Sequence, residues 1–128
     1  MSRFHRRLAI AACVAFAGAA IAAIPALGAI VKIDSKVTIS NNAPAFHGRV
    51  KSSNTACEQQ RKVKLFKERS GADKLLGKDK TNHHGKWEIV VQPLKSGAYY
   101  AKVVRREEGT AGTTFVCRGD RSRTIVID

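Results

Sequence analysis

The chain has 128 residues, of which 23 are Lys or Arg and ten are Asp or Glu, so its formal net charge is +13. This length is the usual size of a single domain and leaves room for only a thin hydrophobic core. The excess of basic residues favours encounters with anionic partners, although charge alone encodes no particular ligand.

The first 28 residues have the composition of an export signal. Three arginines precede an uncharged, alanine-rich run at residues 8–24, and small residues follow it. This order is typical of a Sec-type signal peptide. We therefore predict cleavage after Gly28 or Ala29 and secretion to the cell envelope or beyond it. The alternative is a retained anchor, because residues 8–31 exceed the roughly 20 residues that span a bilayer.

Residues 29–128 are predicted to form a single domain. Removal of the signal takes away three basic residues and no acids, which leaves 100 residues with a net charge of +10. It also removes Cys13, so Cys57 and Cys117 remain as an even pair in an exported chain. We predict that they form a disulfide. Closing so long a loop stabilises a domain by roughly 4 kcal/mol in the chain-entropy model.

Hydrophobic residues alternate with polar ones throughout this domain. In residues 45–52, Phe46 and Val50 share one face while charged or polar side chains share the other, as in a half-buried strand. No window shows a convincing helical period. The fold class predicted is all-β, an antiparallel Ig-like or prealbumin-like β-sandwich of about seven strands. The further predicted strands are residues 36–40, 61–68, 73–80, 85–92, 98–104, 114–118 and 123–128.

Turn compositions separate these strands, among them residues 82–85 and 107–112. The first of these turns contains His83 and His84, which could hold a transition metal. The spacing lacks the HxH or HxxxH pattern of a ligand set, so we interpret the pair as turn residues. The turn then directs Trp87 into the core. Phe66 falls on the polar face of its strand, and the pattern does not account for it.

Three motifs together carry a family resemblance. The segment CEQQRKVKLF has the form C-x3-R-x-V-x-L, KTNHHGKW contains T-x3-G-x-W, and LKSGAYYAKV has the form L-x2-G-x-Y-x-A-x-V. With Cys117 followed by Ser122, the chain resembles the prealbumin-like, or carboxypeptidase-regulatory-like, β-sandwich of secreted bacterial proteins. The resemblance implies structural roles for Gly97, before a strand, and for Tyr99, as a tyrosine corner whose hydroxyl bonds to nearby backbone.

Basic residues cluster on the predicted strands and beside them. If the outer faces of these strands adjoin, they form a positive surface for anionic polymers such as cell-wall phosphate, acidic polysaccharide or nucleic acid. The alternative is a solvated face that keeps the sandwich soluble. The candidate anion-binding residues are Lys62, Lys64, Lys67, Arg69, Lys102, Arg105 and Arg106.

Catalysis has little support in the sequence. There is no GxSxG, HExxH or glycine-rich phosphate loop, and the acids are scattered. The related hydroxyisourate hydrolases end in a YRGS-type motif, whereas this chain ends in RTIVID. We predict a non-catalytic binding or structural module without a cofactor. The sequence identifies no partner; the candidates are an anionic envelope polymer and another secreted protein. The alternatives are accordingly a binder of anionic polymers and a protein-interaction or inhibitor module.

Overall fold

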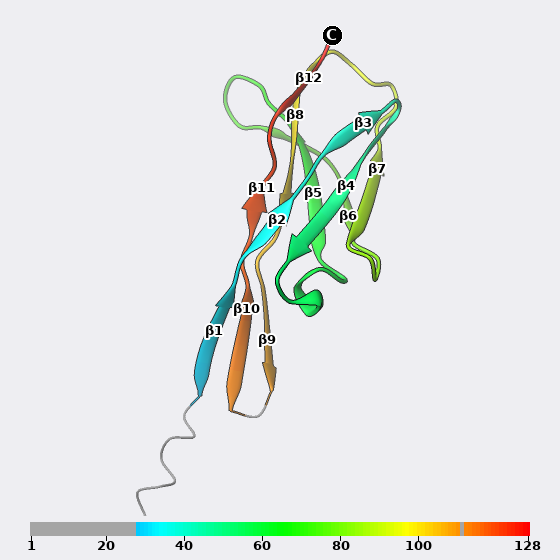
Figure 1. The fold of residues 1–128 in the computed structure, drawn as a ribbon. Coiled ribbons are helices and arrows are strands. Elements are labelled where there is room, and N and C mark those ends of the chain that lie inside the picture. The colour runs from blue at the N-terminus through cyan, green and yellow to red at the C-terminus, as the bar shows by residue number, and fades with distance from the viewer. Residues whose placement is uncertain (1–27, 111) are drawn as a thin grey trace, which may run out of the picture.

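The computed structural model describes residues 28–110 and 112–128 (Figure 1). The predicted signal peptide, apart from Gly28, lies outside the described residues. Most of the described chain is β-strand, and a short 3-10 turn at Thr55–Cys57 follows the fourth strand. Within the described ranges, no helix is long and apolar enough to cross a membrane.

The strands are labelled in chain order. They are β1 (Ala29–Ile33), β2 (Ser35–Val37), β3 (Ser40–Asn42), β4 (Ala45–Ser52), β5 (Lys62–Lys67), β6 (Lys74–Lys80), β7 (Lys86–Val90), β8 (Gly97–Val103), β9 (Arg106–Thr110), β10 (Thr113–Cys117), β11 (Asp120–Arg121) and β12 (Ile125–Ile127).

Two antiparallel sheets form a β-sandwich (Figure 1). The first sheet has the order β11–β8–β5–β6, and β12 also pairs with β8. The second sheet is built on β4, which pairs with β2 and β3 along one edge and with β7 along the other. The predicted all-β antiparallel fold is therefore confirmed.

The core lies between these two sheets and is made by the alternating residues of their strands. Val63 and Leu65 of β5 are completely buried, and Trp87 of β7 is only 2% exposed. Phe46 of β4 packs against Tyr99 of β8, with ring centroids 4.8 Å apart. Each side chain of this size contributes roughly 1.5–3 kcal/mol when it is fully buried. The period-two pattern thus selects which face of each strand turns inward.

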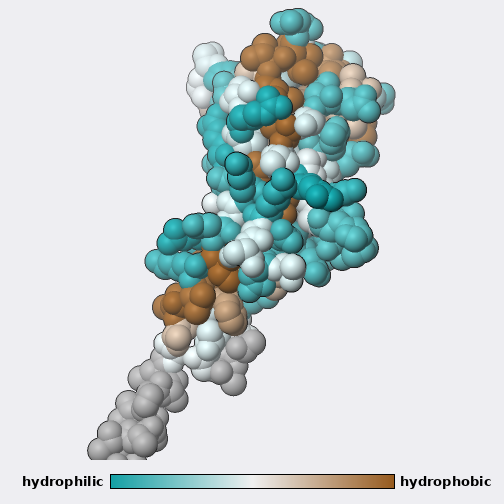
Figure 2. All heavy atoms as spheres, in the orientation of Figure 1, coloured by the Kyte–Doolittle hydropathy of each residue, from teal (hydrophilic) through white to brown (hydrophobic). Residues whose placement is uncertain are grey.

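Beyond one end of the sandwich, β1, β10 and β9 form a three-stranded arm (Figure 1). Its β1 runs parallel to β10, unlike the pairs of the sandwich. The turn predicted at residues 107–112 is wrong over most of its length, because β9 occupies Arg106–Thr110. Backbone pairing with β10 supports β9, which lacks alternating polarity. Ile30 and Val31 of β1 are exposed and give the arm an apolar patch (Figure 2).

The predicted disulfide between Cys57 and Cys117 is confirmed. Their Cα atoms lie 5.5 Å apart, and both side chains are buried. Cys57 ends the 3-10 turn of the sandwich, whereas Cys117 ends β10 of the arm. Ile33 and Phe115 pack with the two cysteines in a small apolar cluster of their own. The disulfide therefore joins the arm to the sandwich.

Residues 28–110 and 112–128 contain twelve strands, where about seven were predicted. The difference arises because three extended runs each contribute more than one strand. They are residues 29–42 with β1 to β3, residues 97–110 with β8 and β9, and residues 113–127 with β10 to β12. The second and third runs leave one sheet and enter another, so their pairing is interrupted where the partner changes.

The turn between β6 and β7 is organised by Asn82. Its side-chain oxygen accepts hydrogen bonds from two backbone amides of the turn, at 2.9 and 3.0 Å. Gly85 has a φ of +79°, a conformation that suits glycine. His83 and His84 are both exposed, with ring centroids 4.0 Å apart. Trp87 then enters the core, and its indole N–H donates to a main-chain carbonyl at 3.2 Å.

Candidate anion-binding surface

The outer face of the first sheet presents basic residues on four neighbouring strands. Residues directly opposite each other in a sheet share one face. Lys64 of β5 lies opposite Lys102 of β8 on one side and Lys78 of β6 on the other. Lys102 in turn lies opposite Arg121 of β11. Neighbouring strands are about 4.8 Å apart, so these four residues form a line across the sheet, which we call the cationic row.

Two further lysines extend this positive face. Lys62 precedes Lys64 by two residues on β5 and therefore points to the same side of the sheet. It lies opposite Lys80 of β6, and both lysines are exposed. The face thus carries six basic residues on adjoining strands.

An aromatic pair borders the cationic row. Phe66 of β5 lies opposite Tyr100 of β8, and their rings stack with centroids 5.3 Å apart at an interplanar angle of 15°. The guanidinium of Arg121 lies 3.6 Å from the centroid of the Tyr100 ring. The stacking on Tyr100 explains why Phe66 falls on the polar face of its strand. The two rings pack together on the outer face, with polar side chains around them.

The lysines of this face have few acidic neighbours. Arg121 forms an ion pair with Glu68 at 2.8 Å, and the other three ion pairs found in the described ranges lie elsewhere. Like charges that face each other across strands destabilise a sheet by up to about 1 kcal/mol per pair. A bound polyanion would remove that repulsion. The described part of the chain contains no ion pair to Lys62, Lys64, Lys78, Lys80 or Lys102.

The surface is hollowed beside the row. A cavity of about 470 Å³ is lined by Lys64, Phe66 and Lys102, and on its other side by Gly119 and Asp120. The Asp120 carboxylate accepts a hydrogen bond from a backbone amide of β2 at 2.9 Å, so the fold already uses it. The hollow gives the positive face a concave element that could receive part of a ligand.

The structure brings together only three of the seven predicted anion-binding residues, Lys62, Lys64 and Lys102. Arg105 and Arg106 lie where the chain enters the arm, and they form ion pairs with Glu107 at 2.7 Å and Glu108 at 3.2 Å. Arg106 also donates to the carbonyls of Ala56, Gln59 and Gln60. Arg106 therefore joins the arm to the sandwich, whereas the side chain of Arg105 bonds to Glu107 within the arm.

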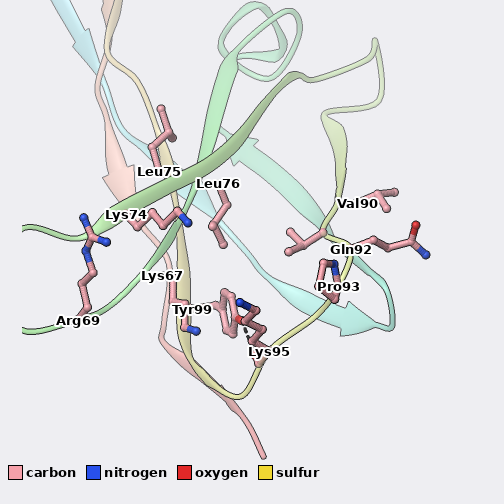
Figure 3. A pocket seen from close by; sticks show the side chains of 11 residues that line it. Lys67, Arg69, Lys74, Leu75, Leu76, Val90, Gln92, Pro93, Lys95 and Tyr99 are labelled. Carbon is pink, nitrogen blue, oxygen red and sulfur yellow. Dashed lines mark hydrogen bonds between the residues drawn. The ribbon is translucent and has the colours of Figure 1, made fainter.

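Lys67 and Arg69 are also separated from the row. They line a cavity at the open end of the sandwich, between the two sheets (Figure 3). Conversely, sequence reasoning missed Lys78, Lys80 and Arg121, which complete the basic face. The available signal was the alternation of lysines along β6, but only the register with β5 shows that these residues lie opposite Lys62 and Lys64.

Gly97 and Tyr99 lie at the same open end. Gly97 begins β8 with a φ of +147°, which favours glycine. Tyr99 is 1% exposed, and its hydroxyl donates to the carbonyl of Lys95, four residues upstream. A buried ring with a hydroxyl bonded to upstream backbone is the arrangement of a tyrosine corner.

Arg61 is completely buried, and sequence reasoning assigned it no role. Its guanidinium donates to the Ser35 hydroxyl at 2.8 Å and to the carbonyls of Cys57 at 2.6 Å and of Val104 and Arg118, both at 3.0 Å. Its pKa is lowered to about 10, chiefly by loss of hydration on burial and to a smaller extent by the charge of Arg106, while Glu108 opposes both effects. Arg61 thus donates to main-chain carbonyls beside both ends of the disulfide, at Cys57 and at Arg118, which follows Cys117.

A carboxylate and a phenol are paired at the edge of the basic face. The Tyr100 hydroxyl donates to the Asp73 carboxylate at 2.5 Å. This hydrogen bond stabilises the charged carboxylate, so it lowers the pKa of Asp73. The same bond, with a smaller contribution from burial, raises the pKa of Tyr100. Asp73 is therefore held against the outer face of the sheet.

His83 and His84 remain at the tip of the β6–β7 turn, and His47 lies on β4. Across residues 28–110 and 112–128, no three His, Cys, Asp or Glu side chains gather in a way that could hold a metal ion.

Comparison with known proteins gives no family for this chain. No protein-family model matches it, and a search of curated proteins finds no match either.

Proposed function

We propose that this protein is an exported, non-catalytic module that binds anionic polymers through the cationic row. The observation that supports this most directly is the alignment of Arg121, Lys102, Lys64 and Lys78 across four strands. Its lysines face one another without ion-pair partners in the described ranges. A linear polyanion laid along the row would bring successive negative charges to successive strands.

Ligands of this kind are recognised by charge and spacing. Lysine side chains bind phosphate as flexible point charges, so cell-wall phosphate, acidic polysaccharide and nucleic acid share the required chemistry. Neutralising phosphates releases counterions, which makes the affinity fall steeply with salt concentration. The aromatic pair of Phe66 and Tyr100 adds a flat apolar element beside the charges.

The competing explanation is that the lysines only keep the sandwich soluble. Solubility needs charge, but it does not need like charges to face each other across consecutive strands, where they repel. The second sheet is basic too, and its pairs, Lys36 opposite Lys51 and Arg49 opposite Lys86, adjoin along β4, but each of them crosses only two strands. The continuous row therefore favours a ligand on the first sheet.

Export and family membership belong to the same proposal. The Cys57–Cys117 disulfide supports an oxidising compartment, because such bonds persist outside the cytosol. Residues 1–28 supply the matching signal, with cleavage after Gly28 or Ala29. The β-sandwich and the Tyr99 hydrogen bond are in keeping with the prealbumin-like resemblance.

The test compares two triple variants that lose equal charge. Lys64→Gln, Lys78→Gln and Lys102→Gln remove the lysines of the row, whereas Lys36→Gln, Lys51→Gln and Lys86→Gln remove exposed lysines of the second sheet. Polyphosphate binding is measured by calorimetry over a series of salt concentrations. We expect the first triple to reduce the slope of log affinity against log salt by about 2.

The second triple should change the slope by much less. Equal losses in both triples would mean that net charge alone governs binding, and this would overturn the assignment to the row. Absence of polyphosphate and heparin binding by the unaltered protein at low salt would overturn the function itself.

A further inference from the structure

A second cavity, of about 560 Å³, opens at the end of the sandwich opposite the arm. The ends of β5, β6 and β7 and the segment that precedes β8 surround it (Figure 3). It lies between the two sheets, so it is separate from the cationic row on the outer face. Cavities of roughly 300–1,000 Å³ are the usual size for small-molecule sites.

The inner wall of this cavity is apolar. Leu76, Val91, Pro93 and Tyr99 line it, and Leu76 and Val91 pack against the main core. Leu76 is the extra residue of a β-bulge in β6, because Leu65 pairs with Gly77 and Phe66 with Leu75. A bulge redirects a side chain, and here Leu76 points into the cavity (Figure 3).

The rim of the cavity is cationic. Four basic side chains line it, those of Lys67, Arg69, Lys74 and Lys95, and no acidic residue does. The two acids nearest in sequence are held elsewhere. Glu68 pairs with Arg121 at 2.8 Å, and Asp73 accepts the Tyr100 hydroxyl on the outer face. Asp73 also accepts the backbone amide of Arg69 at 3.4 Å, so its charge lies near Arg69, and Lys67, Lys74 and Lys95 keep the rim positive.

The position of Lys67 depends on the absence of a side chain at Gly97. A Cβ there would lie 2.6 Å from Lys67 Cε, and the φ of +147° also disfavours other residues. The ammonium of Lys67 lies 5.7 Å from the centroid of the Tyr99 ring (Figure 3). The Tyr99 hydroxyl donates to the Lys95 carbonyl, which holds the facing segment in place.

We infer that this cavity binds a single-chain amphiphile with an anionic head group. A phosphate or carboxylate would bind to the ammonium groups of Lys67 and Lys95, and the alkyl chain would cover Leu76, Val91 and Pro93. Charge complementarity excludes a cationic head, and the apolar wall distinguishes such a ligand from a bare anion. The site is independent of polymer binding, because the two sets of lysines face opposite sides of the first sheet.

The experiment uses three probes that separate head from tail. Dodecyl phosphate carries both, inorganic phosphate carries only the head, and dodecyl maltoside carries the tail with a neutral head. Binding is measured by calorimetry below the micellar concentration of each amphiphile. We expect saturable one-to-one binding of dodecyl phosphate, at least tenfold tighter than binding of either of the other two.

Matched variants locate the binding. Lys67→Gln with Lys95→Gln should weaken dodecyl phosphate binding at least fivefold, whereas Lys64→Gln with Lys102→Gln, on the outer face, should change it less than twofold. The inference is overturned if dodecyl phosphate does not saturate, if either control probe binds as tightly, or if both double variants weaken binding equally. Loss of polyphosphate binding in the outer-face variant alone would leave this site intact.

Discussion

At the scale of single residues, Arg61 shows how a buried charge can organise main-chain groups. Its guanidinium has no carboxylate partner among its hydrogen bonds and instead satisfies one hydroxyl and three carbonyls. The planar fork of arginine reaches acceptors that lie in several directions, which a lysine ammonium cannot do. Fixing these acceptors is therefore the structural role of Arg61 at the base of the arm.

We expect Arg61→Lys to lower the free energy of unfolding by about 2–3 kcal/mol, because buried acceptors lose their donors. Urea unfolding with the disulfide intact measures this change. Arg49→Lys, at an exposed position on β4, is the matched control and should stay within about 0.5 kcal/mol. Equal effects of the two substitutions would show that Arg61 contributes only its charge.

The Tyr100–Asp73 hydrogen bond makes stability depend on pH at both extremes. The raised pKa of Tyr100 means that the folded state holds this proton more tightly than the unfolded state does. Its stabilisation is therefore present below about pH 10 and is lost as pH rises through the folded pKa. For Asp73, whose pKa is lowered, stabilisation is present above about pH 4 and is lost as pH falls through the folded pKa.

An absorbance titration of phenolate formation tests this bond. The chain has two tyrosines, so Tyr99→Phe leaves Tyr100 as the only one that titrates. We expect its midpoint to lie above 10.0, the ordinary value for tyrosine, and Asp73→Asn in the same background to bring the midpoint down. A midpoint that Asp73→Asn leaves unchanged would rule out the carboxylate as the cause.

At the scale of elements, the disulfide holds the arm on the sandwich. Cys57 and Cys117 are separated by 60 residues in the sequence. Replacing both with alanine should lower the free energy of unfolding by about 4 kcal/mol in the chain-entropy model. Chemical denaturation without reductant measures this, and amide exchange should accelerate most in β9 and β10. Alkylation of both cysteines in the denatured, unreduced protein would refute the bond.

Alternation predicts elements well where one face of a strand is buried. β4, β5, β7 and β8 lie where Phe46, Leu65, Trp87 and Tyr99 repeat at period two with other apolar residues. Alternation does not predict β9, because this strand is stabilised by pairing with β10 and not by burial of one of its faces. β1 was missed because its first residues continue the apolar stretch of residues 8–31, which has the character of a signal or an anchor.

The candidate site was less predictable than the fold. Sequence placed Lys62, Lys64 and Lys102 on outer faces, but adjacency across strands depends on register. Register follows from the β-bulge in β6 and from the order of strands in the sheet, and neither leaves a local pattern. Lys67 was assigned to the same surface as Lys64, although their spacing of three residues puts them on opposite faces.

At the scale of the whole molecule, positive charge covers both outer faces, whereas the proposed polymer-binding row lies on only one of them. The formal net charge of +13 attracts polyanions from any direction. The first sheet then offers a continuous row, and its inner side closes the amphiphile cavity. β5 serves both places, with Lys64 outward and Lys67 inward. One strand thus contributes to both proposed binding sites, which remain chemically distinct.

The parallel pairing of β1 with β10 also sets an order on folding. Ala29 lies opposite Thr113, so the first strand of the domain must wait for a strand 84 residues later. During vectorial synthesis β1 therefore emerges with both edges unpaired, and contacts so distant in sequence form slowly. The disulfide likewise cannot form until Cys117, 60 residues after Cys57, has been synthesised. The sandwich can begin from its middle strands, but the arm closes only when β10 has been synthesised.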